Sequence, residues 1–166
     1  NNVETAKRFS YFINDYFINA VTKGEVDINY LKTMQIHDKN SRDFLIHEKW
    51  KNKTDFIGLN YYRSVYVYPS MIVSMSTARF IGRVPINNHS NHKQPHGILS
   101  DLGWEIYPQG LYDFIMDIHN KWKVPIFVTE NGVADKDDKL RTKFIISHLQ
   151  QLKRGIDDGA WIMGYL

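Results

Sequence analysis

The sequence predicts an α/β fold with a parallel sheet. Three short apolar runs, residues 54–62, 125–130 and 160–166, are rich in strand-forming residues and too short to be helices. Helical patterns lie before the second run and between the second and the third. Strands that alternate with helices are typical of a parallel sheet, which can be open or part of an (α/β) barrel.

The first predicted element is an amphipathic helix over residues 5–21 that ends at Gly24. Its apolar residues recur every three or four positions and predict one buried stripe: Ala6, Phe9, Phe12, Ile13, Tyr16, Phe17 and Ala20. Residues 25–53 are polar and weakly patterned. We expect a loop there, with a short helix around residues 43–48.

The first predicted strand follows, and its polar residues gather on one side. With a period of two, one face carries Phe56, Gly58, Asn60 and Tyr62, and the other carries Ile57, Leu59 and Tyr61. Asn60 and Tyr62 therefore share a face near the C-terminal end of the strand. A turn-forming Asn60 and a Tyr62 at the edge of the core are an equally weighted interpretation of these two residues.

Residues 63–100 are the least regular part of the chain. They include His89, His92 and His96, which lie in a loop rich in Asn without a nearby Cys or acidic residue. A zinc site would need such partners, so a solvated loop is the favoured interpretation.

Two further amphipathic helices are predicted. One begins at Pro108, which suits a first helical turn, and reaches about Lys121. Its expected buried stripe is Leu111, Phe114, Ile115 and Ile118. The other spans residues 141–158 and ends at Gly159, with an apolar face made of Phe144, Ile145, His148, Leu149, Leu152 and Ile156. We interpret His148 as a core residue and not as a catalyst.

Between these helices the run 125–128 leads into Glu130, and Asn131 and Gly132 end the strand at once. Functional residues of α/β barrels collect at the C-terminal ends of strands, where Asn60, Tyr62 and Glu130 are all expected. No glycine-rich phosphate loop follows a predicted strand, so a nucleotide-binding fold lacks its usual marker.

Loop acids and composition narrow the remaining classes. The acidic residues Asp135, Asp137 and Asp138 lack the Gly and the distal Glu of a calcium loop, so we expect no metal site. The net charge is only +3 with scattered basic residues, which speaks against nucleic-acid binding. No apolar run is long enough to span a membrane. The absence of Cys fits a reducing compartment, and we expect a cytoplasmic location, although Asn1 leaves the natural start open.

Three motifs carry a resemblance to a known family. They are Asp-Phe-Ile-Gly-Leu-Asn-Tyr-Tyr at 55–62, Gly-Trp-Glu-Ile-Tyr-Pro-Gln-Gly-Leu at 103–111 and Thr-Glu-Asn-Gly at 129–132. In this order and spacing they resemble the family 1 glycoside hydrolases, the β-glucosidase and β-glycosidase barrels. Residues 141–166 are most similar to the archaeal branch, whereas 25–53 and 64–98 match only loosely.

The resemblance implies a partial (β/α)8 TIM barrel in which residues 1–166 form the C-terminal part of one domain, roughly strands 6 to 8. It implies that Glu130 is the nucleophile of a retaining β-glycosidase acting on β-glucosides or β-galactosides, with no cofactor. Tyr62 would hydrogen-bond Glu130, favour its charged form and orient it, and Asn60 would lie in the active site and bind substrate. Trp104 and Glu105 also fall within a motif, and we expect structural roles for both.

The same resemblance indicates what this sequence does not contain. The acid/base Glu of the family lies in an Asn-Glu-Pro motif after the fourth strand, and Asn-Glu-Pro does not occur here. We therefore expect a complementary N-terminal barrel segment, in the same or in a separate chain, and an inactive 166-residue chain without it. Association of identical chains is left open. The alternative interpretation is a non-catalytic carbohydrate-binding relative or an inactive barrel fragment.

Overall fold

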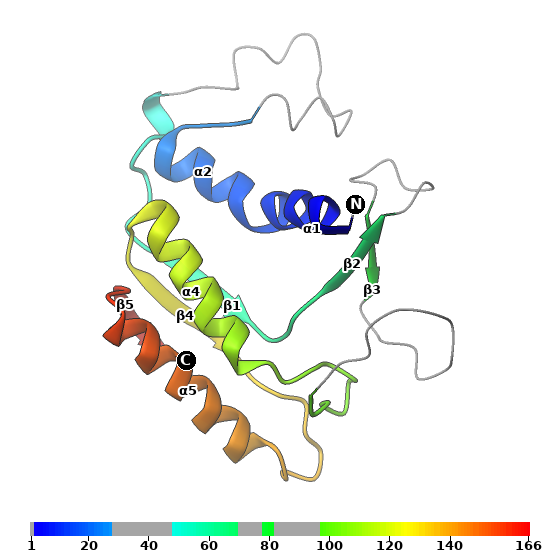
Figure 1. Ribbon diagram of the computed structural model, residues 1–166. Coiled ribbons are helices and arrows are strands. Elements are labelled where there is room, and N and C mark those ends of the chain that lie inside the picture. Colours follow the sequence, from blue (N-terminus) through cyan, green and yellow to red (C-terminus); the bar gives the residue numbers. More distant parts are fainter. Residues whose placement is uncertain (1, 28–47, 70–77, 82–96) are drawn as a thin grey trace. The chain divides into compact units, whose positions relative to one another are not determined.

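The structure is a computed structural model that describes residues 2–27, 48–69, 78–81 and 97–166 (Figure 1). The chain divides into two compact units, one made of Asn1–Thr54 and Val65–Ile81 and the other of Asp55–Ser64 and Gly82–Leu166. The three clustered His residues, and most of the short helix predicted around 43–48, lie outside the described residues. Among the described helices, none has both the length and the apolar character that crossing a membrane requires.

The first unit begins with a helical segment in three parts: α1 (Asn2–Ser10), the π-helix η1 (Tyr11–Asp15) and α2 (Tyr16–Lys23). The segment ends at Gly24, as predicted. Gly24 has a left-handed φ of 69°, and its amide bonds the carbonyls of Ala20 and Asn19. The predicted buried stripe is wrong, because Ala6 is exposed, Ile13 is 54% and Phe17 is 70% exposed, and the other members are only half-buried. A π-helical turn holds an extra residue, so side chains after it are rotated away from those before it.

The same unit contains the short 3-10 turn η3 (Glu48–Trp50) and a two-stranded antiparallel sheet. Strand β2 (Tyr66–Pro69) pairs with β3 (Ala78–Ile81), with Tyr66 opposite Ile81, and both strands lie beside α1. This sheet falls in the stretch that we interpreted as irregular. Strands of four residues are too short for a period of two to stand out in the sequence.

The second unit has the predicted α/β architecture. Its parallel sheet has the order β1-β4-β5, formed by β1 (Ile57–Tyr61), β4 (Ile126–Asn131) and β5 (Ile162–Tyr165). Two helices follow the first two of these strands along the chain, α4 (Pro108–Trp122) before β4 and α5 (Arg141–Asp157) before β5. The two helices run alongside each other (Figure 1). Because parallel strands end at the same edge, the C-terminal residues of all three strands meet there.

One face of this sheet and the inner sides of the two helices form the core. The buried residues are Ile57, Leu59, Tyr61, Ile126 and Val128 from the strands, Leu111, Ile115, Ile118 and Trp122 from α4, and Phe144, His148, Leu152 and Gly155 from α5. The alternation in β1 is the one predicted, with Gly58 and Asn60 exposed. For α4 the predicted stripe is confirmed, except that Phe114 is only half-buried.

The buried stripe of α5 is narrower than predicted. Ile145, Leu149 and Ile156 are 38%, 39% and 48% exposed. Helix α5 packs through the single row of side chains spaced by four, and this row continues towards Gly155. A side chain at Gly155 would come within 3.1 Å of Ile115 Cγ2, so the missing side chain lets α4 approach closely. The flanking apolar residues stay outside this contact.

His148 is a core residue, as predicted. Its side chain is fully buried, its ring stacks on Phe144 at a centroid distance of 3.9 Å, and Nδ1 bonds the Phe144 carbonyl at 2.8 Å. On its other side it faces the ring of Tyr61 at 6.0 Å. Nε2 has no hydrogen-bond partner within the described part of the chain. Burial lowers the pKa of His148 and outweighs the opposing effect of the Phe144 carbonyl, so the ring is neutral in the folded protein.

This burial predicts an acid-sensitive fold. The unfolded His148 side chain titrates near pH 6.5, and the folded one titrates below it. As the pH falls below about 6.5, the unfolded state gains a proton that the folded state resists, so the free energy of unfolding falls by up to about 1.4 kcal/mol per pH unit. Chemical denaturation between about pH 7.5 and pH 5, above the range of ordinary carboxylates, measures this slope. The variant His148→Gln cannot titrate and should show a flatter profile. Equal slopes for both proteins would contradict the prediction.

Candidate active site

The pairing of β1 with β4 changes register just before the carboxylate of Glu130. Leu59 lies opposite Val128, but Asn60 lies opposite Glu130 and Tyr61 opposite Asn131. Thr129 is therefore an extra residue in β4, which makes a β-bulge. Without it, Glu130 would lie opposite the buried Tyr61 and share its face. With the bulge, Glu130 is on the same face as the exposed Asn60.

A hydrogen bond joins the two strand ends at this point. The hydroxyl of Tyr62, the residue that follows β1, donates to Glu130 Oε2 at 2.5 Å. This is the contact that the resemblance implied. The bond to the carboxylate, more than partial desolvation, raises the pKa of Tyr62. The phenol therefore keeps its proton and acts as the donor.

Asn60 is held by the residue before Glu130. The hydroxyl of Thr129 donates to Asn60 Oδ1 at 2.6 Å. This bond crosses from β4 to β1 on the exposed face of the sheet, the face that also carries Gly58. Asn60 and Glu130 are thus neighbours, which is the arrangement expected when both were assigned to strand ends.

The residue after Glu130 ties all three strands together. Asn131 Nδ2 donates to the Tyr61 carbonyl at 2.6 Å, and Asn131 Oδ1 accepts a bond of 2.9 Å from the Tyr165 hydroxyl. The amide of Asn131 thus uses its donor on β1 and its acceptor on β5. Both bonds lie at the C-terminal ends of the strands and limit how far the backbone next to Glu130 can move.

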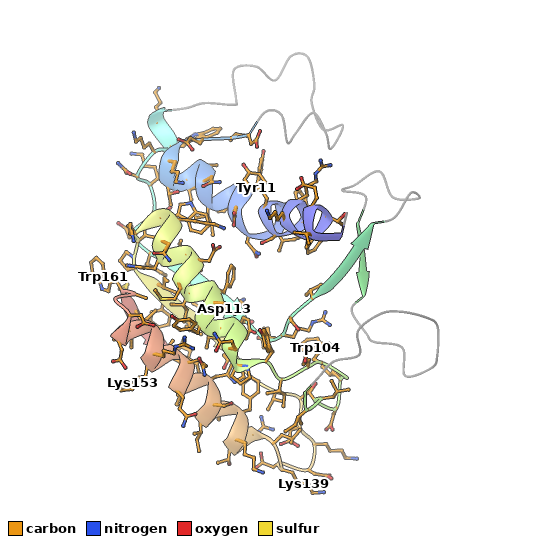
Figure 2. All side chains as sticks on the ribbon, in the orientation of Figure 1. Tyr11, Trp104, Asp113, Lys139, Lys153 and Trp161 are labelled. Carbon is orange, nitrogen blue, oxygen red and sulfur yellow. The ribbon has the colours of Figure 1, made fainter. Side chains whose placement is uncertain are left out.

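The ring of Trp104 lies beside Tyr62. The loop before α4 carries Trp104 (Figure 2). The Trp104 ring lies edge-on to the Tyr62 ring, at a centroid distance of 6.0 Å. The guanidinium of Arg63 lies 4.5 Å from the centre of the Trp104 ring. Next to it, Ser64 donates a hydrogen bond to Glu105 Oε2 at 3.1 Å. Trp104 and Glu105 thus anchor the loop to the segment after β1, and this is compatible with the structural roles expected for them.

The acidic loop after β4 serves the start of α5. Asp135 Oδ2 accepts from the backbone amides of Leu140 at 2.6 Å and Arg141 at 3.0 Å. Desolvation tends to raise the pKa of Asp135, but these amides and that of Lys139 together lower it. Asp137 and Asp138 are exposed and pair with Lys139 and Arg141. In the described ranges, no group of three His, Cys, Asp or Glu side chains is arranged to hold a metal ion.

A known protein family matches this sequence over its full length. The model of Glycosyl hydrolase family 1 matches residues 1–166, the whole chain. The chain belongs to this family. A β-galactosidase from Pyrococcus woesei is 32% identical over 172 residues, which cover 99% of this chain and 31% of the relative. A β-galactosidase from Sulfolobus acidocaldarius is 30% identical and is covered to 30% of its length.

Solved structures of family 1 enzymes share the fold. The β-glycosidase of Thermosphaera aggregans superposes with a TM-score of 0.72 at 26% identity, covering 99% of this chain and 31% of that one. A family 1 β-glucosidase from Thermotoga maritima gives a TM-score of 0.78 at 22% identity. The chain therefore spans about a third of the length of its relatives. Such neighbours imply a TIM barrel, of which the described chain is an α/β segment with three parallel strands.

The C-terminal edge of the parallel sheet brings together the residues predicted for the site, beside others that were not predicted. Asn60, Tyr62 and Glu130 lie at one edge of one sheet, and their individual roles stay predictions. Thr129 and Tyr165 had been given no role, and Asn131 had been expected to end the strand, whereas β4 continues through Asn131. A signal for Thr129 was present, because strict alternation from the buried Val128 puts Glu130 on the buried face. Glu130 was expected at an open strand end, where its carboxylate is accessible. That expectation and strict alternation can both hold only if the strand contains a bulge.

The brace around Asn131 predicts a specific loss of stability. In Tyr165→Phe the Asn131 Oδ1 atom loses its partner, and the free energy of unfolding should fall by about 1 kcal/mol. Urea denaturation measures the change. Tyr112→Phe is the matched control, because it removes an exposed hydroxyl that bonds Asp158 at 2.7 Å, and its effect should be clearly smaller. Equal effects of the two substitutions would show that Asn131 is not braced in this way.

Proposed function

We propose that this chain is the C-terminal part, roughly strands 6 to 8, of a retaining β-glycosidase that hydrolyses β-O-glycosidic bonds through a glycosyl-enzyme on Glu130. The observation that carries the proposal is the hydrogen bond from Tyr62 to Glu130 at the mouth of a parallel sheet, in a chain that belongs to family 1. A carboxylate that is oriented by a hydrogen bond at an open strand end is suited to nucleophilic attack on the anomeric carbon of a sugar.

The proposed chemistry assigns one oxygen of Glu130 to orientation and the other to attack. Oε2 accepts from Tyr62, while Oε1 has no partner among the described residues. The free oxygen attacks the anomeric carbon, and the bond to the leaving group breaks as a carboxylic acid outside this chain protonates the leaving oxygen. Water, deprotonated by the same group, then hydrolyses the glycosyl ester and frees Glu130.

Asn60 is the proposed substrate contact within the chain. It lies opposite Glu130 on the exposed face of the sheet, so its amide borders the space in which a sugar bound to Glu130 would lie. The relatives are named for β-galactosidase, β-glucosidase and β-glycosidase activity, which supports a β-glucoside or β-galactoside as substrate. No cofactor enters this chemistry.

The proposal includes a complementary barrel segment, in the same or in a separate chain. In the second unit β1 and β5 are the edges of the sheet, and Phe56, Trp161 and Met163 are 47%, 63% and 55% exposed. A closed barrel has no such edges and covers apolar residues of this kind. The 166-residue chain alone should be inactive, because it lacks the group that protonates the leaving oxygen. The cytoplasmic location stays a prediction.

Covalent labelling tests the role of Glu130. A mechanism-based fluoroglycoside, incubated with the protein that combines this chain and its complement, should add one glycosyl group, and peptide mass spectrometry should locate it on Glu130. Glu130→Gln should prevent labelling and lower the turnover of an aryl β-glycoside by about 10³-fold or more. The chain without its complement is the negative control. Labelling at another residue would overturn the assignment, and no turnover by the combined protein would favour a non-catalytic carbohydrate-binding relative.

Removal of the Tyr62 hydroxyl should impair the chemical step while substrate still binds. In Tyr62→Phe the carboxylate loses the one hydrogen-bond donor it has among the described residues. We therefore expect kcat to fall on the order of ten- to a hundredfold, with a smaller change in KM. Steady-state kinetics with an aryl β-glycoside measure both constants. Tyr112→Phe removes a hydroxyl that bonds Asp158, directly after α5, and should leave both constants unchanged. A kcat for Tyr62→Phe close to that of this control would contradict the role of Tyr62.

A further inference from the structure

Thr129 holds an unusual position in β4. It is the extra residue of the bulge, so Thr129 and Glu130 both oppose Asn60, whereas every earlier residue of β4 opposes a single residue of β1. Bulges often occur beside active sites, where they turn a side chain to the other face of a sheet. Here the bulge separates the buried Val128 from the exposed Glu130, although only Thr129 lies between them.

The side chain of Thr129 lies on the exposed face of the sheet. Its hydroxyl bonds Asn60 Oδ1 at 2.6 Å. A Cβ atom built on Gly58 would lie 3.5 Å from both Cγ2 and Oγ1 of Thr129, so the side chain rests over the glycine. Gly58 and Asn60 are two residues apart in β1 and share this face. Thr129 is thereby fixed between them.

The bond from Thr129 also decides which way the Asn60 amide faces. A side-chain amide has one acceptor atom and one group with two donors. Because Oδ1 accepts from Thr129, the Nδ2 donors are turned away from β4. Within the described residues, Nδ2 has no protein partner, and Asn60 is exposed. The amide is therefore oriented by the protein and left able to donate to a ligand.

We propose that Thr129 is a positioning residue of this active site, whose hydroxyl orients the Asn60 amide so that Nδ2 donates a hydrogen bond to a hydroxyl of the sugar bound at Glu130. The inference rests on the proposed glycosidase function and deepens it. Thr129 itself does not touch the substrate. It acts through Asn60, by the hydrogen bond from its hydroxyl to Asn60 Oδ1.

Two substitutions separate the hydroxyl from the shape of the side chain. Thr129→Val keeps the branched shape and removes the hydrogen bond, and Thr129→Ser keeps the hydroxyl. In the combined protein, kcat/KM for an aryl β-glycoside should fall about tenfold in Thr129→Val and stay within about twofold of wild type in Thr129→Ser. Asn60→Ala should lose at least as much as Thr129→Val. Adding Thr129→Val to Asn60→Ala should cost little more, because the two residues act as a unit.

A series of aryl β-glycosides that each lack one ring hydroxyl distinguishes positioning from a general loss of structure. For the analogue without the hydroxyl that Asn60 binds, the wild type and Thr129→Val should have nearly equal kcat/KM, and Asn60→Ala should be equal to both. For the other analogues, kcat/KM of Thr129→Val should stay about tenfold below that of the wild type. A structural defect would lower the rates of all substrates by the same factor. Thermal unfolding of each variant checks that the fold is retained.

The outcomes separate this inference from the proposed function. If Glu130→Gln abolishes turnover but Thr129→Val equals the wild type, the glycosidase assignment stands and the role of Thr129 is refuted. The role is also refuted if Thr129→Val slows every analogue equally, or if Thr129→Ser is as impaired as Thr129→Val. If the combined protein has no turnover that depends on Glu130, the proposed function itself fails. A gap that closes for one analogue, in Thr129→Val and Asn60→Ala alike, supports the proposal.

Discussion

The one-residue bulge between β1 and β4 is the constraint on which the rest of the site depends. Strand β4 must bury Val128 beneath the helices and present Glu130 on the other face, yet strict alternation puts these two residues on the same side. The extra residue Thr129 removes the conflict. A one-residue shift moves every later side chain to the other face of the sheet. One local irregularity therefore lets Val128 stay in the core and Glu130 lie on the exposed face.

The bulge also determines which side chains can hold the site. Thr129 bonds the side chain of Asn60, and Glu130 bonds the hydroxyl of Tyr62. Asn131 bonds the carbonyl of Tyr61. Three consecutive residues of β4 thus bond the three consecutive residues 60–62 after the register shift. Between Asn60 and Tyr62, Tyr61 points to the core, where its hydroxyl donates to the Tyr107 carbonyl at 2.6 Å. Burial raises the pKa of Tyr61, so this donor keeps its proton. Packing of Tyr61 thus limits the movement of its two neighbours, Asn60 and Tyr62.

Sequence patterns predicted the parallel α/β core, both of its helices and the shared face of Asn60 and Tyr62, because these follow from short-range periodicity. Features that depend on pairing were not predicted. The bulge at Thr129 becomes apparent only when the residues of β4 are aligned with those of β1. The hydrogen-bond partners of Asn131 lie 34 and 70 residues away in the sequence. The exposure of Leu149 depends on how closely Gly155 lets α4 approach. The π-helical turn, with its rotated stripe, likewise has no marker in the spacing of apolar residues.

The three-stranded sheet can organise Glu130 without the rest of a barrel, because the hydrogen bonds described for Asn60, Glu130 and Asn131 come from its strands or from the residue directly after β1. Orientation of a nucleophile is a local property of two strand ends. The separation between a nucleophile and an acid in a retaining site, about 5 to 5.5 Å, must instead be set across a closed barrel. A segment of this kind should therefore hold its carboxylate in the reactive orientation and still be unable to break a glycosidic bond. In the proposed enzyme, closure of the barrel would supply the second carboxyl group and leave the geometry around Glu130 unchanged.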